Sequence, residues 1–278
     1  MSGAFSEPTF KGWAKPGPKP PFVPGLEAEE GETLDAISGY FRLFQLKKGH
    51  RFSTDDVLTA WYGTTWCPRA DRTLDLGSGI GSVGMIAAWR LPGARFVTVE
   101  AQDESVRLAR KSARFNGIED RYLIRQGDFR DAGMFREEDR FDLVLGSPPY
   151  FPLGTGIEGD HPQKIACRFE VRGDIFDYCA VAAGVLKPGG LFACVFPTNQ
   201  LRRVEEAADA AKLKIVRRRA VVLKEGEESL ISLFAMLRAE DLPESFKTWV
   251  EPPLIIRARD GSVHPEYAAV KLAIGFPP

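Results

Sequence analysis

A cluster of glycines follows a short apolar run in the first third of the chain. The run Thr73-Leu-Asp-Leu76 is followed by Gly77, Gly79, Gly81 and Gly84. Glycine lets a backbone turn sharply and approach a ligand where a side chain would clash. The last three glycines match the G-x-G-x-x-G fingerprint of dinucleotide-binding loops, although that match is weak by itself. The spacing therefore predicts a loop that holds a cofactor.

Two acidic residues beside this loop distinguish between cofactors. Asp75 stands two residues before the first glycine, and Glu100 ends a second apolar run. A carboxylate inside the loop would repel the pyrophosphate of a dinucleotide, whereas it suits the ammonium and sulfonium cations of S-adenosylmethionine. Glu100 can accept hydrogen bonds from the ribose hydroxyls of either cofactor, so Asp75 carries the discrimination. The alternative is that Asp75 only caps a helix and Glu100 lies in a solvated loop.

A third acidic residue follows a third apolar run, in the sequence Gly127-Asp128-Phe129. Asp128 can accept a hydrogen bond from an adenine amino group, and Phe129 can cover the ring. Acidic residues at the ends of consecutive strands lie together at the edge where parallel sheets bind ligands. The sequence thus predicts S-adenosylmethionine bound by Asp75, Gly77, Gly79, Gly81, Glu100, Ala101, Asp128, Phe129 and Ser147.

A proline pair follows a fourth apolar run, in the sequence Gly146-Ser-Pro-Pro-Tyr-Phe151. With this motif the chain resembles amino-group methyltransferases that carry [Asn/Asp/Ser]-Pro-Pro-[Tyr/Phe/Trp] after the fourth strand. It is most similar to bacterial tRNA (adenine-N6) methyltransferases that modify an adenine next to the anticodon. The resemblance runs from about Phe41 to Tyr267 and includes the segments Gly49–Asp56, Ala166–Glu170 and Ile255–Tyr267.

The chemistry of amine methylation explains such a loop. An exocyclic amine conjugated to a ring is a poor nucleophile because its lone pair is delocalised. Two acceptors, the Pro148 carbonyl and the Ser147 side chain, would bind its two N–H bonds and free the lone pair for in-line attack. The prolines fix the loop, and the Tyr150 ring offers a stacking face to an extruded base. The alternative is a Pro-Pro pair that only stiffens the loop.

Ser147 departs from the pattern of the tRNA enzymes, which normally have Asn at this position. A Ser hydroxyl reaches less far than an Asn amide and can both donate and accept a hydrogen bond. Ser-Pro-Pro-Tyr is also usual in cytosine-N4 DNA methyltransferases, and the same loop family methylates glutamine side chains. We therefore expect adenine N6 of tRNA or another structured RNA as acceptor. A small-molecule amine, a DNA base and a protein glutamine remain alternatives.

The resemblance also implies residues that hold cofactor and substrate. The segment that begins near Gly49 folds over the cofactor in related enzymes, so Thr54 and Asp55 are further expected cofactor contacts. The expected catalytic residues are Ser147, Pro148 and Tyr150, and the expected substrate contacts are Pro149, Tyr150, Phe151 and Arg168.

Two basic stretches could contact an RNA backbone, or they could simply form solvated faces. The first lies among aromatic residues, and the second contains few acidic residues. They consist of Lys47, Lys48, His50 and Arg51, and of Arg202, Arg203, Lys212, Lys214, Arg217, Arg218, Arg219 and Lys224.

The elements that must position these residues alternate between short apolar strands and helices. Such alternation predicts βαβ units and a parallel sheet covered on both faces. Two longer strands, residues 215–223 and 230–237, are joined by a polar turn and predict an antiparallel hairpin. A mostly parallel, seven-stranded α/β sheet that ends in an antiparallel hairpin is the Rossmann-like class I methyltransferase fold. The expected helices are residues 82–90, 104–115, 175–186 and about 200–212.

Composition bounds the remaining possibilities. Lys and Arg total 37 and Asp and Glu total 38 in 278 residues, so any RNA must be held by local patches. Residues 1–38 are rich in Pro and Gly and predict a flexible or docked arm, with one methyltransferase domain and a C-terminal extension over residues 39–278. We expect a cytoplasmic protein without a membrane span, because the sequence has no long apolar segment. The spacing of Cys and His predicts no metal site.

Overall fold

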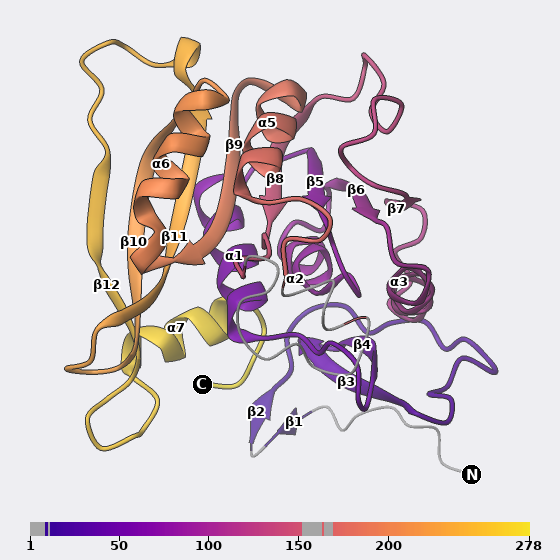
Figure 1. The fold of residues 1–278 in the computed structure, drawn as a ribbon. Helices are drawn as coiled ribbons and strands as arrows, with labels where there is room; N and C mark the ends of the chain where they lie inside the picture. Colours follow the sequence, from indigo (N-terminus) through magenta and orange to yellow (C-terminus); the bar gives the residue numbers. More distant parts are fainter. Residues whose placement is uncertain (1–8, 11, 152–162, 164–168) are drawn as a thin grey trace.

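A mixed sheet forms the centre of the computed structural model, which describes residues 9–10, 12–151, 163 and 169–278 (Figure 1). The strands of this sheet are β5 (Arg72–Leu76), β6 (Arg95–Glu100), β7 (Tyr122–Gln126), β8 (Phe141–Gly146), β9 (Leu186–Pro197), β10 (Leu213–Lys224), β11 (Ser229–Arg238) and β12 (Trp249–Arg257). They lie in the order β12-β10-β11-β9-β8-β5-β6-β7. The neighbours from β9 to β7 are parallel, whereas β11 is antiparallel to both β9 and β10. The predicted parallel sheet and antiparallel hairpin are therefore both confirmed.

The sheet has one strand more than the seven predicted, and this corrects the expected count. β12 pairs in parallel with β10 and lies at the edge of the sheet. It contains Pro252 and Pro253, which cannot donate hydrogen bonds to a neighbouring strand. Prolines are tolerated in an edge strand, where one side of the backbone needs no partner. Because these two prolines interrupt the apolar pattern, this strand was not predicted from the sequence.

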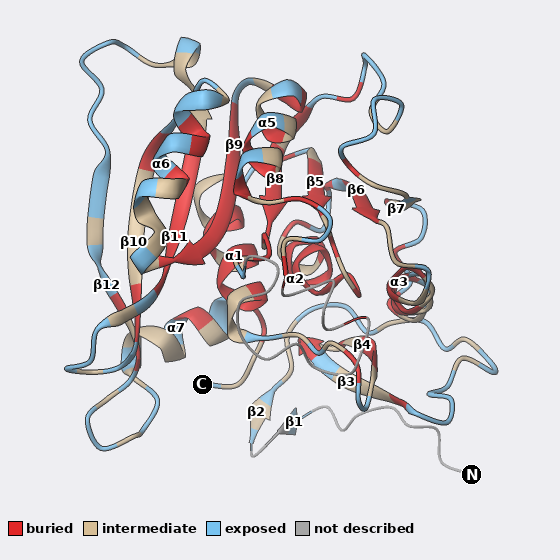
Figure 2. Ribbon diagram, in the orientation of Figure 1, coloured by how far each residue is buried: buried red, intermediate tan, exposed pale blue. Residues whose placement is uncertain are grey.

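Helices cover both faces of the sheet, as predicted. On one face lie α1 (Thr54–Trp66), α2 (Ser82–Arg90) and α3 (Asp103–Phe115), and on the other lie α5 (Ile175–Val185) and α6 (Leu201–Ala210). Side chains alternate along each strand: Leu143 and Leu145 pack with α1 and α2, whereas Val144 packs with α5. Figure 2 shows the resulting band of buried residues along the central strands. The two layers fix where each strand ends and each loop begins.

Smaller elements lie beside the main sheet. They are the short pair β1 (Thr9–Phe10) and β2 (Trp13–Ala14), the hairpin β3 (Glu32–Ser38) and β4 (Phe41–Leu46), and the helix α7 (Pro265–Ala273). β3 falls inside the predicted flexible arm, yet Ile37 is fully buried and Glu32 pairs with Arg107 and Lys111 of α3. Apolar burial and paired charge order residues 32–38, so folded structure begins before residue 39.

The C-terminal helix α7 lies below the N-terminal end of α1 in Figure 1. Just beyond the helix, the Gly275 carbonyl accepts a hydrogen bond of 2.8 Å from the Gly39 amide, between β3 and β4. Arg90 of α2 also donates to the Ala273 carbonyl. The end of the chain therefore holds the β3–β4 hairpin against the helices. Among the described helices, none combines the length and apolar character needed to cross a membrane.

Candidate functional site

The glycine loop joins β5 to α2 with backbone conformations that side chains disfavour. Gly77, Gly79 and Gly81 have φ values of 59°, 54° and 87°, all in the left-handed region. A Cβ on Gly77 would also collide with the hydroxyl of Tyr178, which comes from α5 on the other face of the sheet. Backbone geometry therefore requires glycine at each of these three positions of the glycine loop, and at Gly77 a close contact requires it as well.

Asp75 holds the first turn of α2. Its side chain is 1% exposed, and its Oδ2 accepts a hydrogen bond of 2.9 Å from the Gly84 amide. Capping, the alternative for Asp75 in the sequence, is therefore part of its role, although it also lines the central cavity described below. Burial raises the pKa of Asp75 well above its usual value, and the nearby acids Asp56 and Glu100 raise it further.

Glu100 connects the end of β6 to the glycine loop. Its Oε2 accepts a hydrogen bond of 2.8 Å from the Gly79 amide, and its Oε1 accepts one of 2.7 Å from the Gln102 amide. The side chain is only 6% exposed, so it does not lie in a solvated loop. Each carboxylate oxygen keeps a lone pair that can accept a further hydrogen bond from a ligand.

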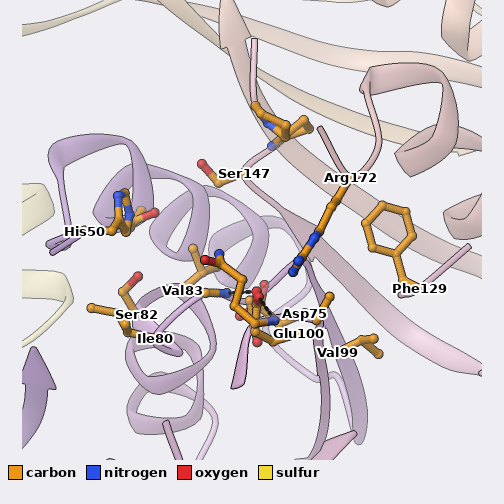
Figure 3. Close-up of a pocket in the computed structure, with 18 of the residues that line it drawn as sticks. His50, Asp75, Ile80, Ser82, Val83, Val99, Glu100, Phe129, Ser147 and Arg172 are labelled. Atoms are coloured by element: carbon orange, nitrogen blue, oxygen red, sulfur yellow. Dashed lines mark hydrogen bonds between the residues drawn. The ribbon is translucent and has the colours of Figure 1, made fainter. Parts of the chain in front are cut away.

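These residues surround a cavity of about 490 Å³ at the carboxyl ends of β5, β6 and β8 (Figure 3). The cavity brings together the glycine loop, the acidic strand ends and the Ser-Pro-Pro-Tyr loop, which lie up to about seventy residues apart in sequence. The predicted site residues that line it are Asp55, Asp75, Gly77, Gly79, Glu100, Ala101, Asp128, Phe129, Ser147, Pro148, Pro149 and Tyr150.

Three predicted site residues among those the structure describes, Gly81, Thr54 and Phe151, do not line this cavity. Gly81 lies at the start of α2, where its φ of 87° turns the chain into the helix. Thr54 faces a neighbouring cavity, and Phe151 is 42% exposed with its ring centre 4.8 Å from that of Tyr150. Arg168 lies outside the described residues.

The Ser-Pro-Pro-Tyr loop leaves β8 with both prolines buried. The Tyr150 carbonyl accepts a hydrogen bond of 3.1 Å from the Gln200 side chain, which precedes α6. The Tyr150 ring is half-buried and meets the Phe196 ring edge-on at 6.2 Å between centres. Contacts from two other elements thus fix the orientation of the loop, and Ser147 is left facing the cavity.

Asp128 and Phe129 line the side of the cavity below β7. Arg130 forms an ion pair of 2.6 Å with Asp128 and holds the pKa of this carboxyl below its usual value. The Phe129 ring packs edge-on against Tyr178, with 4.7 Å between ring centres. Arg130 therefore shares the Asp128 carboxylate with any ligand amino group.

Several lining residues carried no signal in the sequence. Figure 3 shows Arg172 reaching into the cavity toward Glu100. Burial raises the pKa of Glu100, and the charge of Arg172 offsets part of that rise. The same charge adds to the effect of Arg130 in lowering the pKa of Asp128. Arg172 lies in an irregular segment before α5, and Tyr178 looks like an ordinary apolar helix position. The hydroxyl of Ser78 is buried without a hydrogen-bond partner in the described structure. Long-range packing brings Arg172 and Tyr178 to the cavity, whereas Ser78 belongs to the predicted glycine loop.

Comparison with known proteins agrees with this geometry. A family model described as a methyltransferase domain matches residues 69–248, more than half of the chain. The chain belongs to this methyltransferase family. It is 30% identical over 191 residues to a tRNA1(Val) (adenine(37)-N6)-methyltransferase of Bacteroides thetaiotaomicron, covering 67% of this chain and 76% of that protein. It is also 29% identical over 162 residues to a release factor glutamine methyltransferase of Caulobacter vibrioides, covering 52% of each.

A solved structure supports the methyltransferase fold. A predicted O-methyltransferase from Agrobacterium tumefaciens superposes with a TM-score of 0.59 at 17% identity, covering 80% of this chain and 97% of that chain. At this identity the likeness concerns the fold alone, and it confirms the predicted class I architecture. The relatives confirm the resemblance to tRNA adenine methyltransferases, and the chain is an enzyme that transfers methyl groups.

Two neighbouring acids at the start of α1 add negative charge to the methyltransferase cavity. Asp55 and Asp56 both line it, and Asp56 also accepts a hydrogen bond of 2.9 Å from the Ser53 amide. Burial raises the pKa of each carboxyl to about 6, and the charge of Asp56 contributes to the shift of Asp55. A cation bound in the cavity would favour the ionised forms.

The second basic stretch of the methyltransferase is largely neutralised by its own chain. Arg203 pairs with Glu170 and Asp174, and Arg219 pairs with Glu266. Arg217 is enclosed between aromatic rings, with its guanidinium carbon 3.3 Å from the ring centre of Trp66 and 4.1 Å from that of Trp249. Three further cations of the two stretches also form ion pairs: Arg51 with Asp35, Arg202 with Glu206, and Lys214 with Asp209. Lys47 and Lys48 are exposed.

Proposed function

We propose that this methyltransferase moves the methyl group of S-adenosylmethionine to an exocyclic amine, namely N6 of an adenine in tRNA. One observation carries the proposal: the Ser-Pro-Pro-Tyr loop and the glycine loop line the same cavity. A loop that only stiffened the chain would have no reason to face a cofactor cradle. The relative from Bacteroides thetaiotaomicron supports the choice of acceptor, since its name gives a tRNA adenine as the substrate.

The cavity fits S-adenosylmethionine in charge and in unused polar groups. Asp55 and Asp56 carry negative charge above about pH 6 and favour a cationic ligand, and a bound cation would also favour ionisation of Asp75. Glu100 keeps free lone pairs for ribose hydroxyls. The buried Ser78 hydroxyl lacks a partner, and a ligand hydrogen bond would satisfy it. When bound, this cofactor supplies a methyl group activated by a sulfonium.

Residues of the catalytic loop would then act on the acceptor. The Pro148 carbonyl and the Ser147 side chain accept hydrogen bonds from the amine, so its lone pair points toward the methyl group. The Tyr150 ring stacks on the base and holds it in line. No strong base is required, because methylation makes the nitrogen cationic and its proton can leave afterwards to water. Positioning and electrostatics therefore account for the protein's part in the reaction.

A protein glutamine is the second candidate acceptor. The match to the release factor glutamine methyltransferase supports it, and a glutamine amide would present the same two N–H bonds to the loop. That match covers about half of the chain, whereas the tRNA methyltransferase match covers two thirds. We therefore place tRNA first.

Mass spectrometry of nucleosides tests the proposal directly. Total RNA from a strain lacking this protein is incubated with the enzyme and deuterated-methyl S-adenosylmethionine, and the digested nucleosides are analysed. We expect labelled N6-methyladenosine in the tRNA fraction. A parallel incubation contains purified release factor, which is digested and analysed as peptides; label there with none in RNA would support the glutamine candidate instead. Label in neither pool would contradict both.

A further inference from the structure

A second cavity lies next to the first, between the start of α1 and helix α7. Its volume is about 320 Å³, and Ser53 lines both cavities. It offers hydroxyl groups, apolar and aromatic walls, and one ammonium group. The residues that line it are Phe52, Ser53, Thr54, Val57, Tyr267, Lys271, Ile274 and Phe276.

One cation, Lys271, lines this second cavity, and a second, Arg257, lies outside the lining but near enough for its charge to act there. The charge of Arg257, at the end of β12, acts on both Lys271 and Tyr267. Neither cation has a carboxylate within ion-pair distance in the described structure, and the Arg257 guanidinium donates only to the Gly261 carbonyl, at 2.9 Å. The nearby acids are already engaged, Glu266 by Arg219 and Glu225 by Arg259.

Lys271 and the exposed Arg257 repel each other weakly, and a bound anion would relieve that repulsion. Burial lowers the pKa of Lys271, and the neighbouring Arg257 lowers it further. A bound anion would favour the charged form of Lys271. The Ser53 hydroxyl and one hydroxyl of the hydrogen-bonded pair of Thr54 and Tyr267 could donate to it. The aromatic rings of Phe52 and Phe276 give the same cavity an apolar wall. This combination suits a phosphate that is attached to a sugar and a base.

The place of the cavity in the fold indicates which phosphate. β12 runs in the same direction as β5 and β8, so Arg257 lies at the edge from which the glycine loop and the catalytic loop emerge. A base extruded toward Tyr150 leaves the phosphates of its neighbours close to this edge. We infer that the second cavity binds a backbone phosphate of the RNA acceptor through Lys271 and Arg257. This inference rests on the proposed tRNA substrate.

Substitution of the two cations tests the inference. Binding of an unmodified tRNA transcript to the full-length protein is measured by fluorescence anisotropy at several salt concentrations. We expect Lys271→Ala and Arg257→Ala each to raise Kd by about 5- to 10-fold, and to reduce the slope of log Kd against log salt by roughly 0.7 for a lost single-strand phosphate contact. Lys271→Arg keeps the charge and should bind nearly as well as the wild type.

Arg259→Ala is the matched control, because it removes a cation from the same edge. Arg259 is 79% exposed, pairs with Glu225 and lines neither cavity, so its loss should change tRNA affinity by less than about 2-fold. Calorimetry with S-adenosylmethionine checks that each variant is folded and retains its cofactor site. A variant that loses cofactor affinity but not RNA affinity would assign the anion to the cofactor carboxylate and overturn the inference.

The remaining outcomes separate this inference from the proposed function. If wild-type protein binds and methylates tRNA and the Lys271 and Arg257 variants bind it equally well, the phosphate site is wrong and the proposed function stands. If the wild-type protein neither binds nor methylates tRNA, both are wrong.

Discussion

Three acidic residues at the cavity both stabilise local backbone structure and face the space for a ligand. Asp75, Glu100 and Asp56 each accept hydrogen bonds from backbone amides at helix starts or loop turns, and each also faces the space for a ligand. Negative charge is stabilised near helix N-termini, so these residues shape the loops as well as the electrostatic field. Substituting any of the three would mix folding defects with binding defects. Asp55 and Tyr150 allow cleaner tests.

The pKa of Asp55 predicts how pH controls cofactor affinity. Its folded-state pKa of about 6 lies above the ordinary value of 3.8, so the empty fold loses stability as pH rises through 6 and the carboxyl ionises. A bound cation favours that ionised form. We therefore expect calorimetric affinity for S-adenosylmethionine to rise between pH 5.5 and 7.5, by at most about 10-fold per pH unit for each proton released.

Asp55→Asn should flatten this pH profile, because it removes one of the two groups that titrate near pH 6. Asp56 remains in the variant and retains part of the dependence. Equal pH dependence in the wild type and the variant would contradict the role of Asp55.

The Tyr150 ring should matter for transfer but not for cofactor binding. Stacking of a base on an aromatic side chain is worth about 1–3 kcal/mol, so Tyr150→Ala should lower kcat/KM by roughly 5- to 150-fold. Tyr150→Phe keeps the ring and should retain most of the activity. Single-turnover methylation of tRNA measures the effect, with calorimetry of S-adenosylmethionine as the control. Wild-type transfer by Tyr150→Ala would rule out a stacking role.

At the scale of elements, helix α6 holds the segment of residues 170–174, which precedes α5, in place. Arg203 on α6 bonds both Glu170 and Asp174, and Asp174 caps α5 by accepting hydrogen bonds from Phe176 and Asp177 amides. α5 in turn places Tyr178 against the glycine loop. One guanidinium therefore connects two helices and the segment that carries Arg172.

Loss of this guanidinium should destabilise the fold. Arg203 is 25% exposed and Glu170 only 13%, so Arg203→Ala leaves a mostly buried carboxylate unpaired. We expect the free energy of unfolding in urea to fall by about 1–3 kcal/mol. Arg202→Ala is the control on the same helix, because Arg202 is 90% exposed and its loss should cost less than about 0.5 kcal/mol. Equal effects would show that the connection contributes nothing.

At the scale of the whole molecule, the turn between β3 and β4 meets the segment after α7 over α2. Gly39, between β3 and β4, and Gly275, after α7, pack on Trp89, and their backbones are hydrogen-bonded. Both glycines have positive φ, so backbone shape and the absence of side chains together permit the contact. This contact joins the hairpin, the helix layer and the C-terminal helix.

A methyl group at this junction should be costly. In Gly275→Ala the new Cβ would lie 2.7 Å from the Gly39 nitrogen and 2.8 Å from the Trp89 ring, with φ at 77°. Gly226→Ala is the control, because Gly226 has a similar φ of 92° but open space around it. We expect about 1–2 kcal/mol of destabilisation for the control and about 1–3 kcal/mol more for Gly275→Ala in urea unfolding. Equal losses would mean that the junction is not tightly packed.

The parts of the site that the sequence predicted are those that belong to short sequence motifs. The glycine loop, the acidic strand ends and the Ser-Pro-Pro-Tyr loop could be placed because apolar runs mark the strands that precede them. Arg172 and Tyr178 could not, because nothing local distinguishes them from ordinary loop or core positions. The same holds for the basic stretch, where the structure shows which cations pair with a carboxylate or stack on aromatic rings.

The sequence by itself determined the alternation of strands and helices in the central part of the chain, the class of fold and the loops that carry the chemistry. These depend on periodicity, glycine conformation and proline restriction, which act over a few residues. Only the tertiary structure decided which carboxylates are buried, that β12 joins the edge of the sheet, and that Lys271 and Arg257 lie near one cavity with no carboxylate of the described residues at ion-pair distance. Burial and charge pairing depend on residues far apart in the chain, and only the folded chain brings them together.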